Sequence, residues 1–179
     1  MSDDLRAIQR VLEGDTEAFR ILVKQHEDRL FCLIRNLIPD RNDCEDIAQE
    51  VFLAAYTHLR SYDHGRATFS TWLLTIARNK CLNALKKKTP AAAAGAPEPE
   101  DARTPDAEAS EAEWFQQLDA ALDALPLEQK TTFVLAEIQG LSLQEIGTIE
   151  RVSLGTVKSR LSRAREKLRS LLRRTAEQS

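Results

Sequence analysis

The amino-acid sequence predicts an all-α protein in which two small helical domains are joined by a flexible linker. Three observations support this fold class. Apolar residues recur at helical spacing through most of the chain, and only 6 of the 179 residues are glycine, which favours helices with short connections over sheets. One stretch without large apolar side chains divides the chain. Because 179 residues can form one medium domain or two small ones, this stretch decides for two.

The dividing stretch covers residues 89–113 and contains four of the six prolines and seven acidic residues. A segment of this composition cannot bury a core, so we expect a disordered linker. The predicted domains are therefore residues 1–88 and residues 114–179.

The formal net charge of −3 hides an uneven distribution of charge. The linker has one basic residue against seven acidic ones. Residues 60–88 have seven basic residues against one acidic, and residues 151–174 have nine against one. Two basic stretches in a nominally acidic protein predict two contacts with a polyanion.

The N-terminal domain should be a small bundle of four helices. A short helix covers residues 5–12. The next follows Asp15, whose side chain can cap it, and continues until Pro39 and Asp40 break the pattern.

The third helix begins near Asp43, and the fourth covers about residues 68–87, after a loop at residues 61–66 whose turn residues mark it. The side chains that should pack inward from these helices are Phe19, Leu22, Val23, Leu30, Leu33, Ile34, Leu37, Ile47, Val51, Phe52, Ala55, Tyr56, Phe69, Trp72, Leu73, Ile76, Ala77, Leu82 and Leu85.

The C-terminal domain should begin with a helix over residues 114–125. Pro126 then suits the first turn of a second helix, which continues to Gly140. The apolar residues of this second helix include Phe133, Val134, Leu135 and Ile138.

The last part of the chain has the pattern of a helix-turn-helix. Ser142 and Glu145 form a capping box at the start of a short helix, and Ser153 caps the long final helix after a tight turn at residues 150–152. A short helix, a tight turn and a basic helix are the parts of this motif.

The final helix has two distinct faces. Val157, Leu161, Ala164, Leu168 and Leu172 form its apolar stripe, Lys158, Ser159, Ser162 and Arg163 lie opposite, and Arg160 and Arg165 lie on the flanks. Arginine, lysine and serine suit phosphates and base edges, so the polar face is predicted to read a major groove. The alternative is a solvated basic surface helix.

The basic segment of the N-terminal domain mixes cations with amides, at Arg78, Asn79, Lys80, Asn83 and Lys86. A loop with Tyr62 and Arg66 precedes it. Aromatic rings can stack on unpaired bases and amides can read their edges, so this mixture favours melted or single-stranded DNA. Phe69 and Trp72 fit a core better than a base platform, whereas for Tyr62 the two interpretations are equal.

The third helix of the N-terminal domain opens with a dense acidic and amide cluster at Asp43, Glu45, Asp46, Gln49 and Glu50. The helix dipole favours the first two acids near the helix start, but accounts less well for Gln49 and Glu50. The sharper interpretation is a surface that docks another protein.

These segments together resemble the extracytoplasmic-function (ECF) RNA polymerase sigma factors. The resemblance rests on GDTEAFRILVKQH, DCEDIAQEVFLAAY, ATFSTWLLTIARNKCLNALKKK and LPLEQKTTFVLAEIQGLSLQEIGTIERVSLGTVKSRLSRAREKL, in this order. It implies an alternative sigma factor, which binds core polymerase and promoter DNA. The N-terminal domain corresponds to region 2, which opens the minus-10 element, and the C-terminal domain to region 4, which reads the minus-35 element.

The resemblance also implies roles for particular residues. Asp43, Asp46, Gln49 and Glu50 would dock on the β′ clamp helices of polymerase. Tyr62, Arg66, Asn79, Lys80, Asn83 and Lys86 would contact the minus-10 element, although the loop at residues 61–68 varies within the family. Thr156, Lys158, Ser159, Ser162, Arg163 and Arg165 would contact the minus-35 element. The β flap of polymerase and an anti-sigma factor are further expected partners.

We expect a cytoplasmic protein without a membrane span, because the chain has no long apolar run and no signal-peptide pattern at its start. Cys32, Cys44 and Cys81 are far apart in the sequence and predict reduced thiols rather than a disulfide or a metal site. No cofactor is expected. A two-domain operator-binding regulator is the main rival; an enzyme is disfavoured because no acid, base or nucleophile motif is present.

Overall fold

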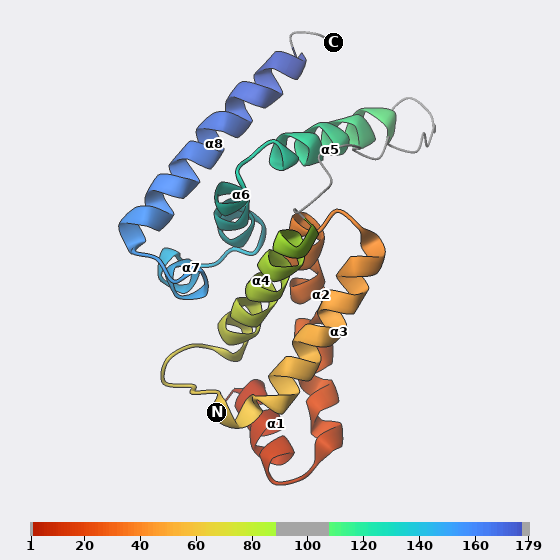
Figure 1. The fold of residues 1–179 in the computed structure, drawn as a ribbon, viewed down its shortest axis with the longest axis vertical. Coiled ribbons are helices and arrows are strands. Elements are labelled where there is room, and N and C mark those ends of the chain that lie inside the picture. Colours follow the sequence, from red (N-terminus) through yellow and green to blue (C-terminus); the bar gives the residue numbers. More distant parts are fainter. Residues whose placement is uncertain (1, 89–107, 177–179) are drawn as a thin grey trace.

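The computed structural model describes residues 2–88 and 108–176, and every regular element in these ranges is helical (Figure 1). The longer helices are α1 (Asp3–Leu12), α2 (Phe19–Leu37), α3 (Arg41–Thr57), α4 (Phe69–Lys88), α5 (Glu108–Asp123), α6 (Leu127–Phe133), α7 (Leu143–Glu150) and α8 (Leu154–Ala176). Three short segments join them: η1 (Thr16–Ala18), η2 (Leu59–Ser61) and the π-helical η3 (Val134–Ile138). The predicted all-α class is confirmed. None of the described helices is long and apolar enough to cross a membrane.

Side-chain caps define where the N-terminal helices begin. The Asp15 carboxylate accepts from the backbone N–H of Ala18 at 3.3 Å and caps η1, which leads directly into α2. Asp40, expected only to end α2, also starts α3, because its Oδ1 accepts from the N–H of Asn42 at 2.8 Å. This cap satisfies a free N–H of the first turn, so α3 begins two residues before the predicted Asp43.

Helices α1 to α4 pack as the predicted bundle. The side chains buried at its centre include Leu22, Leu30, Leu33 and Ile34 of α2, Val51 and Ala55 of α3, and Phe69, Leu73 and Ala77 of α4. Tyr56 is the exception among the expected core residues. It remains 40% exposed, with its ring edge against Phe19.

The first helix of the C-terminal half begins earlier than the helix predicted over residues 114–125. Helix α5 starts at Glu108, so the last six residues of the predicted linker have helical backbone, and the rest of that linker lies outside the described residues. Alanine and glutamate favour helix, and acidic residues are favourable at a helix N-terminus, which accounts for the extension. Pro126 precedes the first turn of α6 as its N-cap instead of lying within that turn.

The helix-turn-helix is formed by α7 and α8. The Ser142–Glu145 capping box is present as predicted, and the Ser153 hydroxyl accepts from the N–H of Thr156 at 3.2 Å at the start of α8. Arg151 makes the turn with φ of 56°, and it is the only non-glycine residue with positive φ in the described ranges. This left-handed conformation reverses the chain at a cost of about 1–2 kcal/mol.

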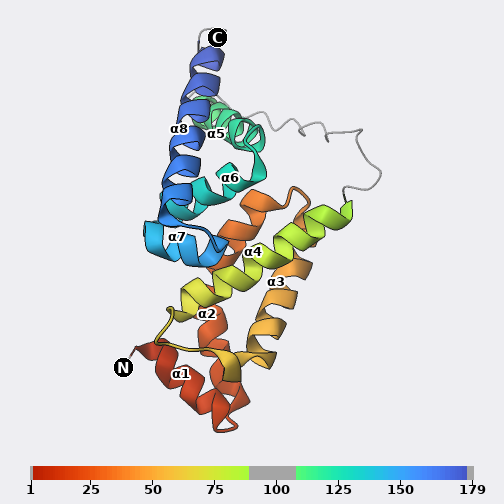
Figure 2. The ribbon, with the colours of Figure 1, turned by 60° about the vertical axis from the view of Figure 1, so that its left-hand side comes forward.

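The two halves of the chain pack against each other, with α7 lying on α4 (Figure 2). One buried apolar cluster extends from α1–α4 through Leu135 and Ile146 to Val157 of α8. Arg29 and Gln139 exchange hydrogen bonds: the Arg29 guanidinium donates to the Gln139 carbonyl at 3.1 Å, and the Gln139 amide donates to the Arg29 carbonyl at 3.0 Å. The sequence gives no sign of this packing, because either half could close its own apolar faces.

Candidate nucleic-acid interface

Helix α8 has the two faces that its sequence predicts. Val157, Leu161, Ala164 and Leu168 are buried, and Leu172 is half-buried. On the other side Lys158, Ser162 and Arg163 are exposed and Ser159 is half-buried. The apolar stripe therefore fixes α8 on the rest of the C-terminal half and leaves the basic face open to a ligand.

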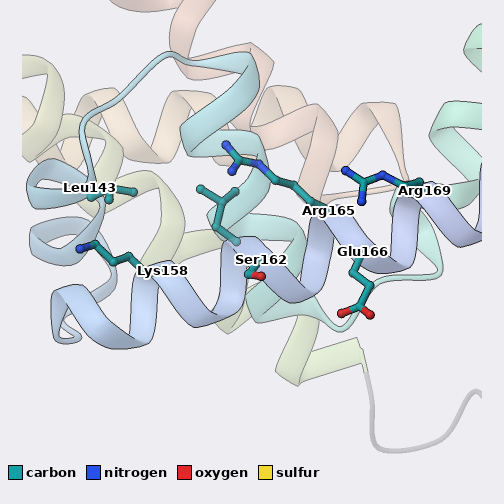
Figure 3. Close-up of a pocket in the computed structure, with 7 residues that line it drawn as sticks. Leu143, Lys158, Ser162, Arg165, Glu166 and Arg169 are labelled. Atoms are coloured by element: carbon teal, nitrogen blue, oxygen red, sulfur yellow. The ribbon is translucent and has the colours of Figure 1, made fainter.

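A groove of about 680 Å³ runs beside this face, between Leu143 of α7 and one side of α8 (Figure 3). Lys158, Arg165 and Arg169 line it, the first two about two helical turns apart and the last two about one turn apart, together with Ser162 and the Glu166 carboxylate. Several cations along one groove suit the phosphates of a nucleic-acid backbone. Arg169 was not among the predicted contacts, although it follows Arg165 by four residues and so shares its side of the helix.

Two of the predicted contact residues also bind within the chain. The Arg165 guanidinium forms an ion pair with Glu137 of η3, with its Nε donating at 3.0 Å. The Thr156 hydroxyl lies 3.0 Å from the Ser153 hydroxyl in the cap of α8. Both residues therefore help to hold the start and middle of α8 in place.

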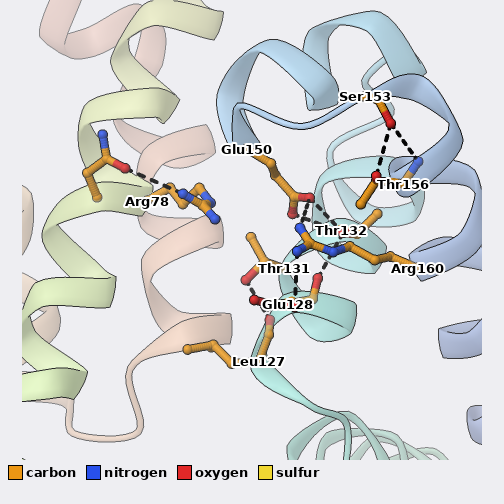
Figure 4. Close-up of polar contacts among 10 residues, drawn as sticks. Arg78, Leu127, Glu128, Thr131, Thr132, Glu150, Ser153, Thr156 and Arg160 are labelled. Atoms are coloured by element: carbon orange, nitrogen blue, oxygen red, sulfur yellow. Dashed lines mark hydrogen bonds and ion pairs between the residues drawn. The ribbon is translucent and has the colours of Figure 1, made fainter.

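A buried ion pair fixes α8 against α6 and α7 (Figure 4). The side chain of Glu150, the last residue of α7, has no exposed surface and accepts from the Arg160 guanidinium at 2.9 Å. Its two oxygens also accept from the Thr132 hydroxyl at 2.9 and 3.0 Å. Arg160 reaches Glu128 of α6 at 3.0 Å with its other terminal nitrogen. Arg160 on the flank of α8 is thus a structural residue.

The amide and basic residues of α4 lie along its surface. Asn79 and Lys80 are half-buried, and Asn83 and Lys86 are exposed. In the preceding loop Arg66 is exposed and pairs with Asp63 at 3.1 Å. These residues leave amides and cations accessible on one helix and one loop.

Tyr62 is half-buried in an aromatic cluster. Its ring packs at 5.7 Å from Phe69 and 5.4 Å from Trp72, and its hydroxyl donates to the Ala67 carbonyl at 3.0 Å. Burial raises the pKa of the Tyr62 hydroxyl. These contacts agree with the packing interpretation of Tyr62, and stacking on a base stays a prediction. Phe69 is a core residue, as expected.

Arg78 of α4 extends toward the C-terminal half (Figure 4). Its Nε is buried and has no hydrogen-bond partner among the described residues. Burial lowers the pKa of this guanidinium, and the nearby Glu150 carboxylate opposes the change. Packing of the two halves therefore covers a cation that adjoins the predicted minus-10 residues.

The acidic and amide residues of α3 divide between two environments. Asp46, Gln49 and Glu50 are exposed, while Ile47 and Val51 on the next side of the helix are buried. Asp43 is half-buried. Three exposed polar residues with buried apolar neighbours leave one side of α3 free for a protein partner.

The cysteines are free thiols. Cys44 and Cys81 are buried, and burial raises the pKa of Cys81 to about 12. The thiolate is the reactive form, so Cys81 is inert at neutral pH.

The sequence matches two parts of one family, Sigma-70 region 2 over residues 22–90 and Sigma-70 region 4 over residues 115–168. It is 35% identical over 180 residues to the ECF RNA polymerase sigma factor SigW of Bacillus subtilis (strain 168), which covers 94% of this chain and 96% of that protein. The chain belongs to the ECF RNA polymerase sigma factors. Its function is accordingly that of an alternative sigma factor in promoter-specific transcription initiation.

Solved structures agree with the fold of this sigma factor. The structure of CnrH in complex with the cytosolic domain of CnrY has a TM-score of 0.74 at 26% identity and covers 96% of this chain and 97% of that one. The sigma factor RpoE of Bartonella quintana, in complex with the anti-sigma factor NepR, has a TM-score of 0.69 at 24% identity, with 87% and 96% covered. Both likenesses extend over the two halves of this sigma factor.

We predict that Arg160→Ala will destabilise this sigma factor by about 3–5 kcal/mol, because it leaves the buried Glu150 carboxylate without its cation. Arg163→Ala, an exposed arginine on the same helix, is the matched control and should stay within about 0.5 kcal/mol of the parent. Urea denaturation measures both. Adding Glu150→Gln to Arg160→Ala should recover part of the loss, and equal stabilities for the two single variants would show that the pair does not fix α8.

Proposed function

We propose that this sigma factor uses three separate surfaces to start transcription: α8 reads the minus-35 element, α4 and the loop before it read and help to melt the minus-10 element, and α3 docks on core polymerase. The observation that carries the proposal is the exposed basic face of a capped α8 in helix-turn-helix geometry. The role is that of a DNA-binding initiation factor, and we propose no catalytic activity for the chain. A cytoplasmic location goes with this role.

The minus-35 proposal rests on the chemistry of α8. Lys158, Ser162 and Arg163 can donate to base edges, and Arg169 and Arg165 on the groove side can contact phosphates. Thr156 and Ser159 are half-buried in the first two turns of α8, and we propose that they contact the minus-35 DNA through backbone groups there. Region 4 is also the part that we propose contacts the β flap.

The minus-10 proposal rests on α4. Exposed Asn83 and Lys86, with Asn79 and Lys80 on the same helix, offer amides for base edges and cations for phosphates. Arg66 extends this surface into the preceding loop, and Tyr62 could join it only if its ring left the aromatic cluster.

The packing of the halves limits how both promoter elements can be bound. About 25 base pairs separate elements at minus 35 and minus 10, which at 3.4 Å per base pair is roughly 85 Å. A compact chain of this length is only about 40 Å across. We therefore propose that α7 leaves α4 on the promoter, which would also release Arg78.

We also propose an anti-sigma factor as a partner. The relative from Bartonella quintana is bound to the anti-sigma factor NepR. A partner that favours the packed arrangement of region 2 on region 4 would keep the two reading surfaces too close together for a promoter.

Lys158→Ala should weaken binding of the holoenzyme to its minus-35 element by roughly 1–3 kcal/mol and relax base preference there. Lys167→Ala is the matched control, because the Lys167 ammonium donates to the Ala124 carbonyl just after α5 at 2.7 Å and is not on the proposed reading face. Titration of promoter fragments with single base changes measures affinity and preference. Equal losses for the two variants on all fragments would refute the assignment of the reading face.

Asp46→Arg should abolish association with core polymerase, because it places a cation against a basic clamp surface. Its fold should survive, since exposed substitutions usually change stability by less than about 0.5 kcal/mol. Asp28→Arg makes the same change of charge at an exposed position of α2 and should still bind. Co-purification with core polymerase measures binding and thermal melting checks the fold; a folded Asp46→Arg variant that binds as tightly as the parent would exclude α3 as the docking surface.

A further inference from the structure

One ion pair joins the two proposed binding surfaces of region 2. The Lys80 ammonium of α4 donates to Glu50 Oε2 of α3 at 2.7 Å, across 30 residues of sequence. Lys80 belongs to the proposed minus-10 surface and Glu50 to the proposed polymerase surface. The two surfaces are therefore in direct electrostatic contact.

Both members of the Lys80–Glu50 ion pair are accessible to ligands. The Lys80 side chain is 36% exposed and that of Glu50 is 60% exposed, so a ligand can reach either charge. An exposed ion pair of this kind is weak and shifts an equilibrium by no more than about fivefold. By contrast, the Glu150 carboxylate that pairs with Arg160 has no exposed surface, so no ligand can reach it.

Each ligand would compete for one half of the pair. A DNA phosphate that approaches Lys80 meets the Glu50 carboxylate beside it, which repels the phosphate and neutralises the lysine. A cation of the polymerase surface that binds Glu50 removes that obstacle. The hydrogen bond from Lys80 holds the pKa of Glu50 below its usual range, so the carboxylate is charged at neutral pH.

We infer that Glu50 restrains Lys80 in the free protein, and that docking of core polymerase on Glu50 releases Lys80 for the minus-10 phosphates. The inference rests on the proposed roles of the α3 and α4 surfaces. Because such coupling is reciprocal, DNA bound at Lys80 strengthens docking through Glu50 by the same factor. It makes the minus-10 surface of the free sigma factor weaker than that of the holoenzyme.

Asp46 and Lys86 provide matched controls. Asp46 lies one turn before Glu50, is also exposed, and makes no ion pair within the described part of the chain. Lys86 is an exposed lysine further along α4 that is likewise not paired there. Asp46→Asn and Lys86→Met therefore change the same charges as Glu50→Gln and Lys80→Met without breaking the pair.

The first measurement is the affinity of the free full-length protein for a fluorescent single-stranded 12-mer of random sequence at low salt, since contacts with phosphates do not depend on sequence. Glu50→Gln should bind roughly two- to fivefold more tightly than Asp46→Asn. This difference in affinity should vanish when Glu50→Gln and Asp46→Asn are each combined with Lys80→Met and compared again. Equal affinities of Glu50→Gln and Asp46→Asn with Lys80 present would overturn the inference.

Lys80→Met alone should bind the 12-mer more weakly than the parent. If it binds equally well, the proposed DNA contact of Lys80 fails, which is a separate result from failure of the coupling.

The second measurement is affinity for core polymerase without DNA. Lys80→Met should bind core polymerase up to about fivefold more tightly than Lys86→Met, because Glu50 is released from its ion pair. Equal core affinities of these two variants would contradict reciprocal coupling.

Discussion

The ion pair between the buried Glu150 carboxylate and Arg160 is the interaction on which the exposed basic face of α8 depends. The carboxylate joins the end of α7 to Arg160 of α8 and Thr132 of α6 in a place without access to water. These contacts of Glu150 keep the apolar stripe of α8 packed and its basic face exposed. Because Arg151 turns the chain at positive φ directly after Glu150, the contacts of Glu150 also hold a strained turn in place.

A second constraint comes from the packing of α7 on α4. The apolar cluster that the halves share and the Arg29–Gln139 hydrogen bonds favour the packed arrangement. Burial of the Arg78 guanidinium opposes it, because its Nε finds no hydrogen-bond partner among the residues that the structure describes. The interface between the halves therefore combines favourable packing with the unfavourable free energy of burying the Arg78 guanidinium. A balance of this kind would suit the separation of α7 from α4 that we propose on a promoter.

Local signals predicted much of the fold and of the candidate site. The Ser142–Glu145 box, the Ser153 cap and the apolar stripe of α8 can be inferred from spacing within a few residues, and all three are present. Contacts between distant residues could not be predicted in this way. The Glu150–Arg160 and Glu50–Lys80 pairs, the packing of α7 on α4 and the position of Arg78 depend on how the helices pack, which periodicity does not encode. Asp40 was not predicted as the N-cap of α3, because Pro39 before it indicated only the end of the preceding helix.

Binding to a promoter with and without core polymerase tests most directly whether the chain is an initiation factor rather than an operator-binding regulator. The target can be a duplex promoter selected by run-off transcription from a genomic library. We predict weak binding with little sequence preference for the free protein, and tight specific binding together with strand opening when core polymerase is added. Equally tight and equally specific binding of the free protein to the duplex would contradict the account.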